Sequence, residues 1–195
     1  MSKTARGQRS VDAVLDAALE QVSREGLDSL TIGQLATASG MSKAGLFAHF
    51  GSRENLQLAT IERARTRFVN LVIVPSLGAS GPRVRLLKMI DNWIRYLTNL
   101  DDAGGCPLGL SQIEFARRQG PVSTRLAEVQ RELDALLLSM VVAAVEAGEI
   151  SKNVNPVDVI FQIEAIMSHA LFRGQLLSEP DVYTRAKTLI VSLIA

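Results

Sequence analysis

Apolar side chains recur every three to four positions along almost the whole chain, the spacing that places them on one face of an α-helix. No stretch of four to eight residues alternates Val, Ile or Thr between turn residues, as a β-hairpin strand does. Caps and breakers divide this pattern into nine expected helices, at about 10–24, 32–38, 43–50, 53–72, 82–100, 107–118, 121–148, 156–172 and 180–194. The sequence therefore predicts an all-α protein.

Single residues set several of these bounds. N-caps are expected where a side-chain oxygen can accept a hydrogen bond from a free backbone N–H, at Ser10, Thr31, Ser42 and Ser52. Gly40 is expected to break the chain between two short helices, and Pro75 to stop the long helix that begins after Ser52. The helix expected at 121–148 should bury a seam of Val122, Leu126, Val129, Leu133, Leu136, Met140 and Val145.

The helix expected at 156–172 is apolar around more than half of its circumference. Its apolar residues cannot all face one core: Val157, Val159, Ile160, Phe161, Ile163, Ile166, Met167, Ala170, Leu171 and Phe172. One interpretation is that the last two helices pack against those of a second copy as a four-helix interface in a homodimer. The alternative is that they form a fully buried pair inside one subunit.

Composition narrows the class of protein. The 195 residues are 47% hydrophobic and 21% charged, a globular balance that excludes general disorder. One cysteine and two histidines make a disulfide framework or a clustered metal site unexpected, and no cofactor is predicted. The uncharged residues 69–82 include prolines and glycines, and no apolar stretch follows the basic N-terminus, so a cytoplasmic location is predicted.

Residues 30–50 fit a helix-turn-helix. Ala36 is small where two helices would cross closely, Gly40 can adopt the positive φ of a tight turn, and Leu35, Met41 and Leu46 can form the buried wedge. Two helices of about seven residues are unstable alone, so the first helix should pack behind them. Together the three helices would form a DNA-reading unit.

Residues 10–56 resemble the DNA-binding domain of the TetR family of transcriptional regulators. The similarity lies in Leu-Thr-Ile at 30–32, Gly-Met-Ser-Lys at 40–43 and Leu-Phe-Ala-His-Phe-Gly-Ser-Arg-Glu-Asn-Leu at 46–56. Gly-Gly-Cys-Pro-Leu at 104–108 and the later Glu-Phe resemble one branch of that family. The resemblance implies a helix-turn-helix domain at 1–52 and a helical domain at 53–195 that binds an effector and dimerises.

Seven residues are candidates for DNA contact. Thr31 and Ser42 stand at expected helix N-termini, which favour phosphate, although they could serve as caps alone. Lys43 could reach a guanine or a phosphate, while Ala44 and Gly45 allow close approach to thymine methyls. The resemblance places Lys43 and His49 against DNA, although Lys43 could be a solvated surface charge and His49 could be merely structural. Phe47 stands where the family more often has tyrosine, so the hydroxyl contact of that tyrosine is lost. Lys3, Arg6 and Arg9 could follow the DNA as a mobile arm or form an ordinary terminus.

The resemblance also implies an effector pocket in the larger region. The candidate lining residues are aromatic, pliable or polar in an apolar setting: Phe68, Met89, Trp93, Tyr96, Cys106, Phe115, Met140, Glu164 and His169. Each apolar one could equally be plain core, and Glu164 and His169 could satisfy each other or contact solvent. Cys106 could be a reactive sensor or an inert thiol.

The leading prediction is a homodimeric transcriptional regulator without enzymatic activity, a repressor released from a pseudo-palindromic operator by a small-molecule effector. Two alternatives compete with it. One is a helical ligand-binding or scaffold protein that has lost DNA reading, and the other is a thiol enzyme that pairs Cys106 with His49 or His169.

Overall fold

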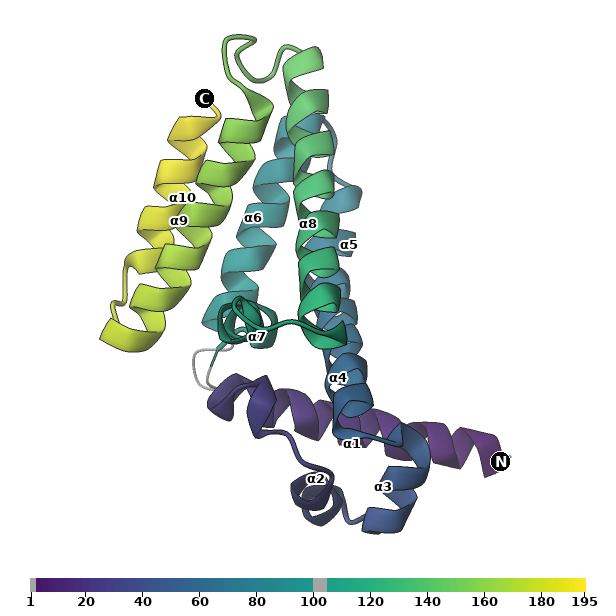
Figure 1. The fold of residues 1–195 in the computed structure, drawn as a ribbon. Helices are drawn as coiled ribbons and strands as arrows, with labels where there is room; N and C mark the ends of the chain where they lie inside the picture. The colour runs from purple at the N-terminus through teal and green to yellow at the C-terminus, as the bar shows by residue number, and fades with distance from the viewer. Residues whose placement is uncertain (1–2, 100–104) are drawn as a thin grey trace. The chain divides into compact units, whose positions relative to one another are not determined.

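The computed structural model describes residues 3–99 and 105–195, with side chains from residue 11 onward. Every regular element in these residues is helical (Figure 1): α1 (Lys3–Glu25), the 3₁₀ turn η1 (Leu27–Ser29), α2 (Ile32–Ser39), α3 (Lys43–Phe50), α4 (Arg53–Phe68), the π-helical turn η2 (Val69–Ile73), α5 (Val74–Leu77), α6 (Pro82–Thr98), α7 (Pro107–Phe115), α8 (Pro121–Glu146), α9 (Pro156–Leu177) and α10 (Val182–Leu193). With α4, η2 and α5 counted as one continuous helix, the described residues contain nine α-helices. The all-α prediction is confirmed.

Several predicted helix limits differ from the structure; the helix expected to end at about 172, for example, continues as α9 to Leu177. Ser10 does not cap the first helix, because α1 already begins at Lys3 and no proline or unfavourable φ interrupts it. The backbone of Lys3, Arg6 and Arg9 is therefore helical. Pro75 does not stop the fourth helix either, since a π-helical turn precedes it and Pro75 lies in the first turn of α5, where a missing N–H breaks no bond.

The chain forms two compact units. Unit 1 comprises Met1–Thr66 and Cys106–Glu128, and unit 2 comprises Arg67–Gly105 and Val129–Ala195. Unit 1 thus adds α7 and the start of α8 to the helix-turn-helix region. The functional division at residue 52 remains a prediction.

In unit 1, α1 packs against α2, η1 and α7, and α2 packs against α3. Figure 1 shows α1 passing across α2 and α3, as a supporting helix must if two short helices are to be stable. The core between them is fully buried and aliphatic: Val14, Ala18, Leu19, Val22, Leu35 and Leu46. Arg63 of α4 pairs with Asp16 of α1 through two nitrogens, at 2.8 and 2.7 Å.

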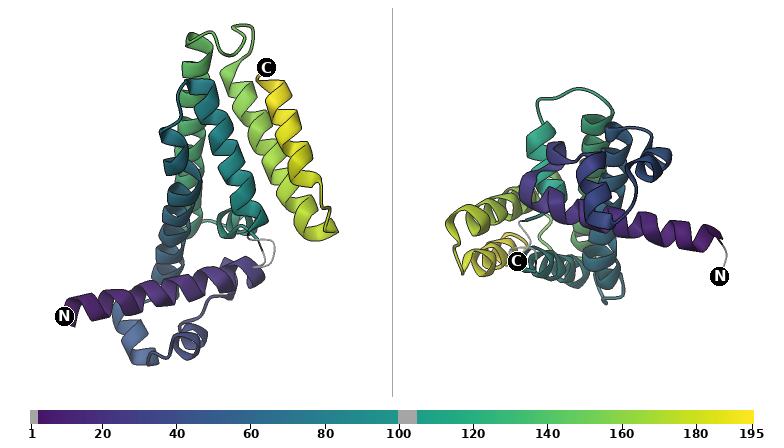
Figure 2. Two further views of the ribbon diagram at one scale, coloured as in Figure 1. Left: turned by 180° about the vertical axis from the view of Figure 1, so that it is seen from behind. Right: turned by 90° about the horizontal axis from the view of Figure 1, so that it is seen from below.

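In unit 2, α10 packs against α9 and α6, and α6 packs against η2 and α5. Figure 2 shows α9 and α10 side by side from behind as well, so they form a hairpin. Gly174 lets the helices approach closely, since a Cβ there would lie 3.0 Å from the hydroxyl oxygen of Tyr183. Ser178, with φ of 50°, ends α9 in the left-handed conformation.

The buried seam of α8 differs from the predicted one in its second half. Val122, Leu126, Val129 and Met140 are buried as expected, but Leu133, Leu136 and Val145 are only half-buried. Leu137, Val141 and Ala144 take their places in the core. A face of a straight helix drifts along its length, because 3.6 residues per turn does not divide seven, and the predicted spacing did not follow that drift.

Candidate nucleic-acid interface

The helix-turn-helix of unit 1 has the predicted turn. Gly40 ends α2 with φ of 68° and ψ of 13°, the left-handed conformation that glycine adopts without steric strain. Leu35 and Leu46 are almost completely buried between the helices, Ala36 is buried beside them and Met41 is half-buried. The turn therefore fixes the direction of α3 relative to α2.

Both predicted N-caps of this region are confirmed. The Thr31 hydroxyl oxygen accepts a hydrogen bond from the backbone N–H of Gln34 at 3.2 Å, and the Ser42 hydroxyl oxygen accepts one from Gly45 at 3.0 Å. Thr31 and Ser42 are both exposed. The N-termini of α2 and α3 consequently present hydroxyl groups and remaining N–H groups to solvent, a combination that favours phosphate.

The outer surface of α3 carries the remaining DNA candidates. Lys43, Ala44 and His49 are exposed, Gly45 is half-buried, and the ring of Phe47 is 58% exposed. The Lys43 ammonium nitrogen lies 3.6 Å from where a Cβ on Gly33 would stand, so this cation sits over the first turn of α2. The helix thus exposes a cation and an aromatic ring beside a backbone with almost no side chains.

A turn of five residues, Gly26–Leu30, leads into α2, and two helices hold it. From α4, Arg53 Nε donates to the Leu30 carbonyl at 2.9 Å, and the buried Gln57 amide donates to the Leu27 carbonyl at 3.1 Å. From α7, the Glu114 carboxylate accepts hydrogen bonds from two backbone N–H groups of the turn. No sequence pattern assigned a role to Glu114, whose only signal was the Glu-Phe pair of the family branch.

Asp28 lies at the centre of this turn between two guanidinium groups. Arg53 Nη2 is 2.5 Å and Arg118 Nη1 is 3.0 Å from its carboxylate oxygen. Partial burial acts to raise the pKa of Asp28, but the hydrogen bonds and charges of Arg118 and Arg53 together lower it below its usual value. Asp28 is therefore a stable anion at neutral pH.

Comparison with known proteins identifies this arrangement. Residues 82–190, more than half of the chain, match the family model described as tetracyclin repressor-like, C-terminal domain, and residues 14–60 match that of bacterial regulatory proteins, tetR family. The chain belongs to the TetR family. It is accordingly a DNA-binding transcriptional regulator, as the resemblance of residues 10–56 predicted.

Individual relatives and structures agree with this TetR-family assignment. An uncharacterised helix-turn-helix-type transcriptional regulator of Mycobacterium tuberculosis is 28% identical over 155 residues, 68% of this chain and 77% of the relative. The regulator BetI of Rhizobium meliloti is 31% identical over 78 residues, 40% of this chain and 38% of BetI. A TetR regulator from Chloroflexus aurantiacus has a similar fold, with a TM-score of 0.87 and 24% identity over 97% of this chain and 96% of that one.

The effector-domain candidates of this TetR regulator do not all gather in one unit. Phe68, at the end of α4, meets the edges of Trp93 and Tyr96 of α6, with ring centroids 5.5 and 5.6 Å apart and interplanar angles of 86° and 88°. Met89 and Met140 are buried in unit 2 as well. Phe115 and Cys106 are buried in unit 1, where the Phe115 ring lies under the Arg118 guanidinium.

Glu164 of α9 belongs to a polar cluster that the sequence did not predict. The Gln130 amide nitrogen donates to Glu164 Oε1 at 2.9 Å and to Asp134 Oδ1 at 2.7 Å. Burial, a hydrogen bond with Asp134 and repulsion by its charge raise the pKa of Glu164 to about 7, against the smaller opposing effect of Gln130. Glu164 therefore pairs with α8 and not with His169.

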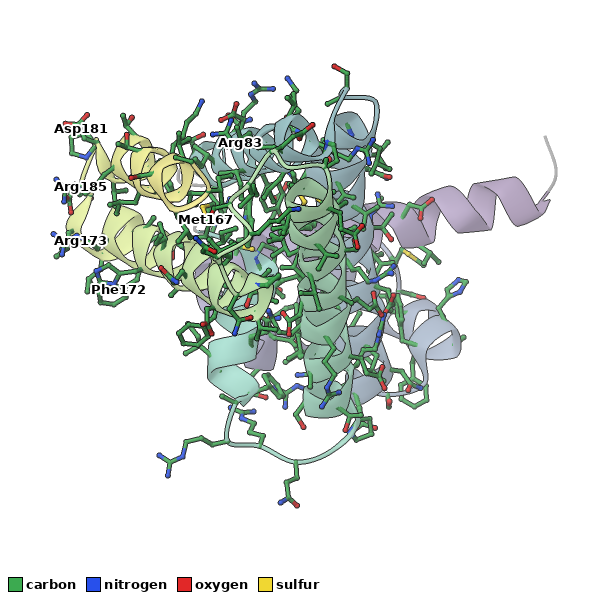
Figure 3. All side chains as sticks on the ribbon, turned by 90° about the horizontal axis from the view of Figure 1, so that it is seen from above. Arg83, Met167, Phe172, Arg173, Asp181 and Arg185 are labelled. Atoms are coloured by element: carbon green, nitrogen blue, oxygen red, sulfur yellow. The ribbon has the colours of Figure 1, made fainter. Side chains whose placement is uncertain are left out.

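His169 is exposed on α9 and stacks on Phe172, with ring centroids 6.1 Å apart and an interplanar angle of 22°. Figure 3 shows Phe172 pointing away from the other helices of its unit, whereas Met167 points inward. Residues 100–104, which include the first glycine of the Gly-Gly-Cys-Pro-Leu motif, lie outside the described residues. Among the described residues no group of His, Cys, Asp and Glu could hold a metal ion, and no helix is long and apolar enough to cross a bilayer.

Proposed function

We propose that α3 enters the major groove with Lys43, Ala44 and Gly45 toward the base edges. Thr31, Ser42, Phe47 and His49 then contact the flanking sugar-phosphate backbone. The observation that carries this assignment is the exposed and almost bare first turn of α3, bordered by the Lys43 ammonium and by two capped helix N-termini. The small residues Ala44 and Gly45 let the backbone of α3 approach the bases closely. The Lys43 ammonium and the N–H groups of the helix N-termini bind phosphate and so fix the position of the protein along the DNA.

Fluorescence anisotropy tests this assignment with DNA from upstream of the protein's own gene and, if that fragment shows no preference, with a fragment selected from the genome. We expect binding that is much tighter than to scrambled DNA and that weakens steeply with salt. Lys43→Ala should bind the operator more weakly than the wild type. The control Lys152→Ala, which replaces an exposed lysine of unit 2, should bind like the wild type. A reduced salt dependence in Lys43→Ala would assign the lysine to phosphate, and relaxed sequence preference would assign it to a base.

The proposed active species is a homodimer that joins through the last two helices. Several large apolar side chains on α9 and α10 are at least half exposed in the single chain: Val157, Phe161, Phe172, Leu176, Leu177 and Leu189. A surface this apolar is rare on a monomer. Its presence supports a twofold interface, and two subunits would then read half-sites about one helical turn or a little more apart on a pseudo-palindromic operator.

The proposed regulatory input is a small apolar effector that binds in unit 2 beside Phe68, Trp93, Tyr96 and Met89. This aromatic cluster joins the end of α4 to α6, so a ligand that separates the rings would displace α4. Release from DNA requires that the effector bind the DNA-incompetent state more tightly. In a thermal-shift screen of apolar compounds, genuine effectors should raise Tm for the wild type, lose that effect in Trp93→Ala, and release DNA.

The role that follows is that of a cytoplasmic repressor with no catalysis of its own. A thiol enzyme is disfavoured because the Cys106 side chain is buried, which shields the thiol from a substrate in solution. A scaffold that has lost DNA reading is disfavoured by the intact caps and turn of the helix-turn-helix. Operator binding in the anisotropy assay separates the repressor from both alternatives.

A further inference from the structure

We propose that Glu114 is a positioning residue for DNA recognition, and this inference rests on the proposed docking of α2 and α3. The Glu114 carboxylate holds the turn Gly26–Leu30, from which α2 begins. Through this contact α7 acts as a determinant, besides α4, of where the helix-turn-helix lies within unit 1.

Both oxygens of the Glu114 carboxylate are used. Oε2 accepts a hydrogen bond from the Leu27 N–H at 2.7 Å, and Oε1 accepts one from the Asp28 N–H at 3.0 Å. The two partners lie 87 and 86 residues away in the chain. Hydrogen bonds to an ionised acceptor are stronger than neutral ones, so a single side chain of α7 anchors two consecutive peptide groups of the turn.

Gly26 is matched to this carboxylate in two ways. Its φ of 85° lies in the region that other residues rarely adopt. A Cβ at this position would also stand 2.9 Å from Glu114 Oε2, closer than real Cβ atoms come to an oxygen. The backbone of the turn therefore approaches the carboxylate as closely as only a glycine allows.

A second contact from the same side strengthens the hold. Arg118, which follows α7, pairs with Asp28 Oδ1 at 3.0 Å, and its guanidinium lies 4.4 Å from the centre of the Phe115 ring. Arg53 of α4 pairs with the same carboxylate oxygen. A basic side chain of α4 and one from the segment that follows α7 thus meet on one residue of the turn.

The turn transmits the position of these helices to the DNA-reading surface over a very short path. Leu30 ends the turn and Thr31 caps α2, so only Ser29 and Leu30 stand between Asp28, which contacts Glu114, and the proposed phosphate contact at Thr31. A binding constellation needs its groups held to within about half an ångström. A turn that is released from Glu114 must be ordered again on binding, and that ordering reduces affinity for the specific site.

The test compares Glu114→Gln with the wild type on an operator fragment, obtained as above, and on scrambled DNA. Glutamine keeps the size but places an amide donor against a backbone N–H. We expect specific affinity about tenfold weaker, the factor for one lost charge-assisted hydrogen bond. Affinity for scrambled DNA should stay within about twofold, because the phosphate-facing charges are unchanged. A stoichiometric titration should give an unchanged active fraction, which a purely destabilising substitution would lower.

Glu128→Gln is the matched control. It makes the same change of charge in the same unit, on an exposed ion pair with Arg125, and should bind the operator like the wild type. Arg118→Gln provides a second variant that keeps Glu114 and loses the exposed pair with Asp28 together with the cation–π contact on Phe115. We expect it to weaken specific affinity about two- to fivefold, and it decides the question if Glu114→Gln does not fold.

Amide hydrogen exchange identifies the outcome that overturns the proposal. In Glu114→Gln the N–H groups of Leu27 and Asp28 should exchange faster, since the glutamine amide leaves a single, neutral acceptor oxygen for two donors. If they do so while operator affinity remains that of the wild type, Glu114 braces the turn without positioning the DNA reader. Equal binding of the wild type to every operator candidate and to scrambled DNA would instead overturn the proposed docking, and this inference with it.

Discussion

The side-chain amide of Gln130 donates one hydrogen bond to Glu164 and one to Asp134, so two carboxyl groups from facing helices share a single donor. The remaining contact between them is a hydrogen bond that requires a proton. This arrangement favours a protonated Glu164 in the folded protein.

The stability of the folded protein should consequently fall as the pH rises from about 4.5 to above 7. The pKa of Glu164 is about 7 in the folded chain and near 4.5 when unperturbed, so between those values only the folded state holds the proton. Because the folded state binds this proton more tightly than the unfolded state, the contribution of Glu164 to stability is complete below pH 4.5 and is lost as the pH passes 7. Because Glu164 is half-exposed, solvent screening limits the loss to about 1–2 kcal/mol.

Glu164→Gln should remove this pH dependence, since the amide remains neutral throughout. In urea unfolding at pH 5, 6, 7 and 8, the free energy of unfolding of the variant should rise relative to that of the wild type as the pH increases. Glu146→Gln, an exposed residue at the end of α8, should keep the wild-type profile. Parallel profiles for wild type and Glu164→Gln would show that the pair holds no extra proton.

Asn92 should be essential to the π-helical turn. Its Nδ2 donates to the Val72 carbonyl at 3.1 Å, and Asn92 is only 4% exposed. Asn92→Ala leaves that carbonyl without this donor, and we expect the free energy of unfolding to fall by about 1–3 kcal/mol. Asn70→Ala, in the same turn but exposed, should change it by less than about 0.5 kcal/mol. Equal values for the two variants in denaturant titrations would contradict this role.

Ser42 allows its capping and DNA-contact roles to be separated. Ser42→Asp keeps a good N-cap, so Tm should hold, but it places a negative charge where we propose a phosphate. Operator affinity should fall at least about tenfold. Asn155→Asp adds the same charge at the N-cap of α9 and should leave DNA binding unchanged. Wild-type affinity in Ser42→Asp would remove Ser42 from the proposed interface.

Phe161 tests the proposed dimer. Its ring is 72% exposed on α9, so Phe161→Glu should fold normally by circular dichroism. In the dimer the new charge would be buried twice, and sedimentation should show a monomer with weakened operator binding. Val84→Glu replaces an apolar residue of α6 that is 51% exposed and should remain dimeric. An unchanged dimer in Phe161→Glu would place the interface elsewhere.

Local chemistry explains which features the sequence could predict. As helix caps and as the turn residue, Thr31, Ser42 and Gly40 act on neighbours within four residues, so these structural roles follow from the sequence alone. The side chains of Glu114 and Asn92 form hydrogen bonds with backbone groups that lie 87 and 20 residues away along the chain. No local sequence pattern predicts such pairs. The prediction that Pro75 ends the helix was wrong because proline breaks a helix whose preceding turn has α-helical hydrogen bonds, and here that turn is π-helical.

The π-helical turn at Val69–Ile73 also bears on how this chain is compared with its relatives. Its hydrogen bonds span five residues instead of four, so the turn accommodates one residue more than an α-helical turn. A relative whose helix is regular here would need a single-residue gap within 69–73. Without that gap, every position from Val74 to Leu77 would be paired with a side chain about 100° away around the helix axis.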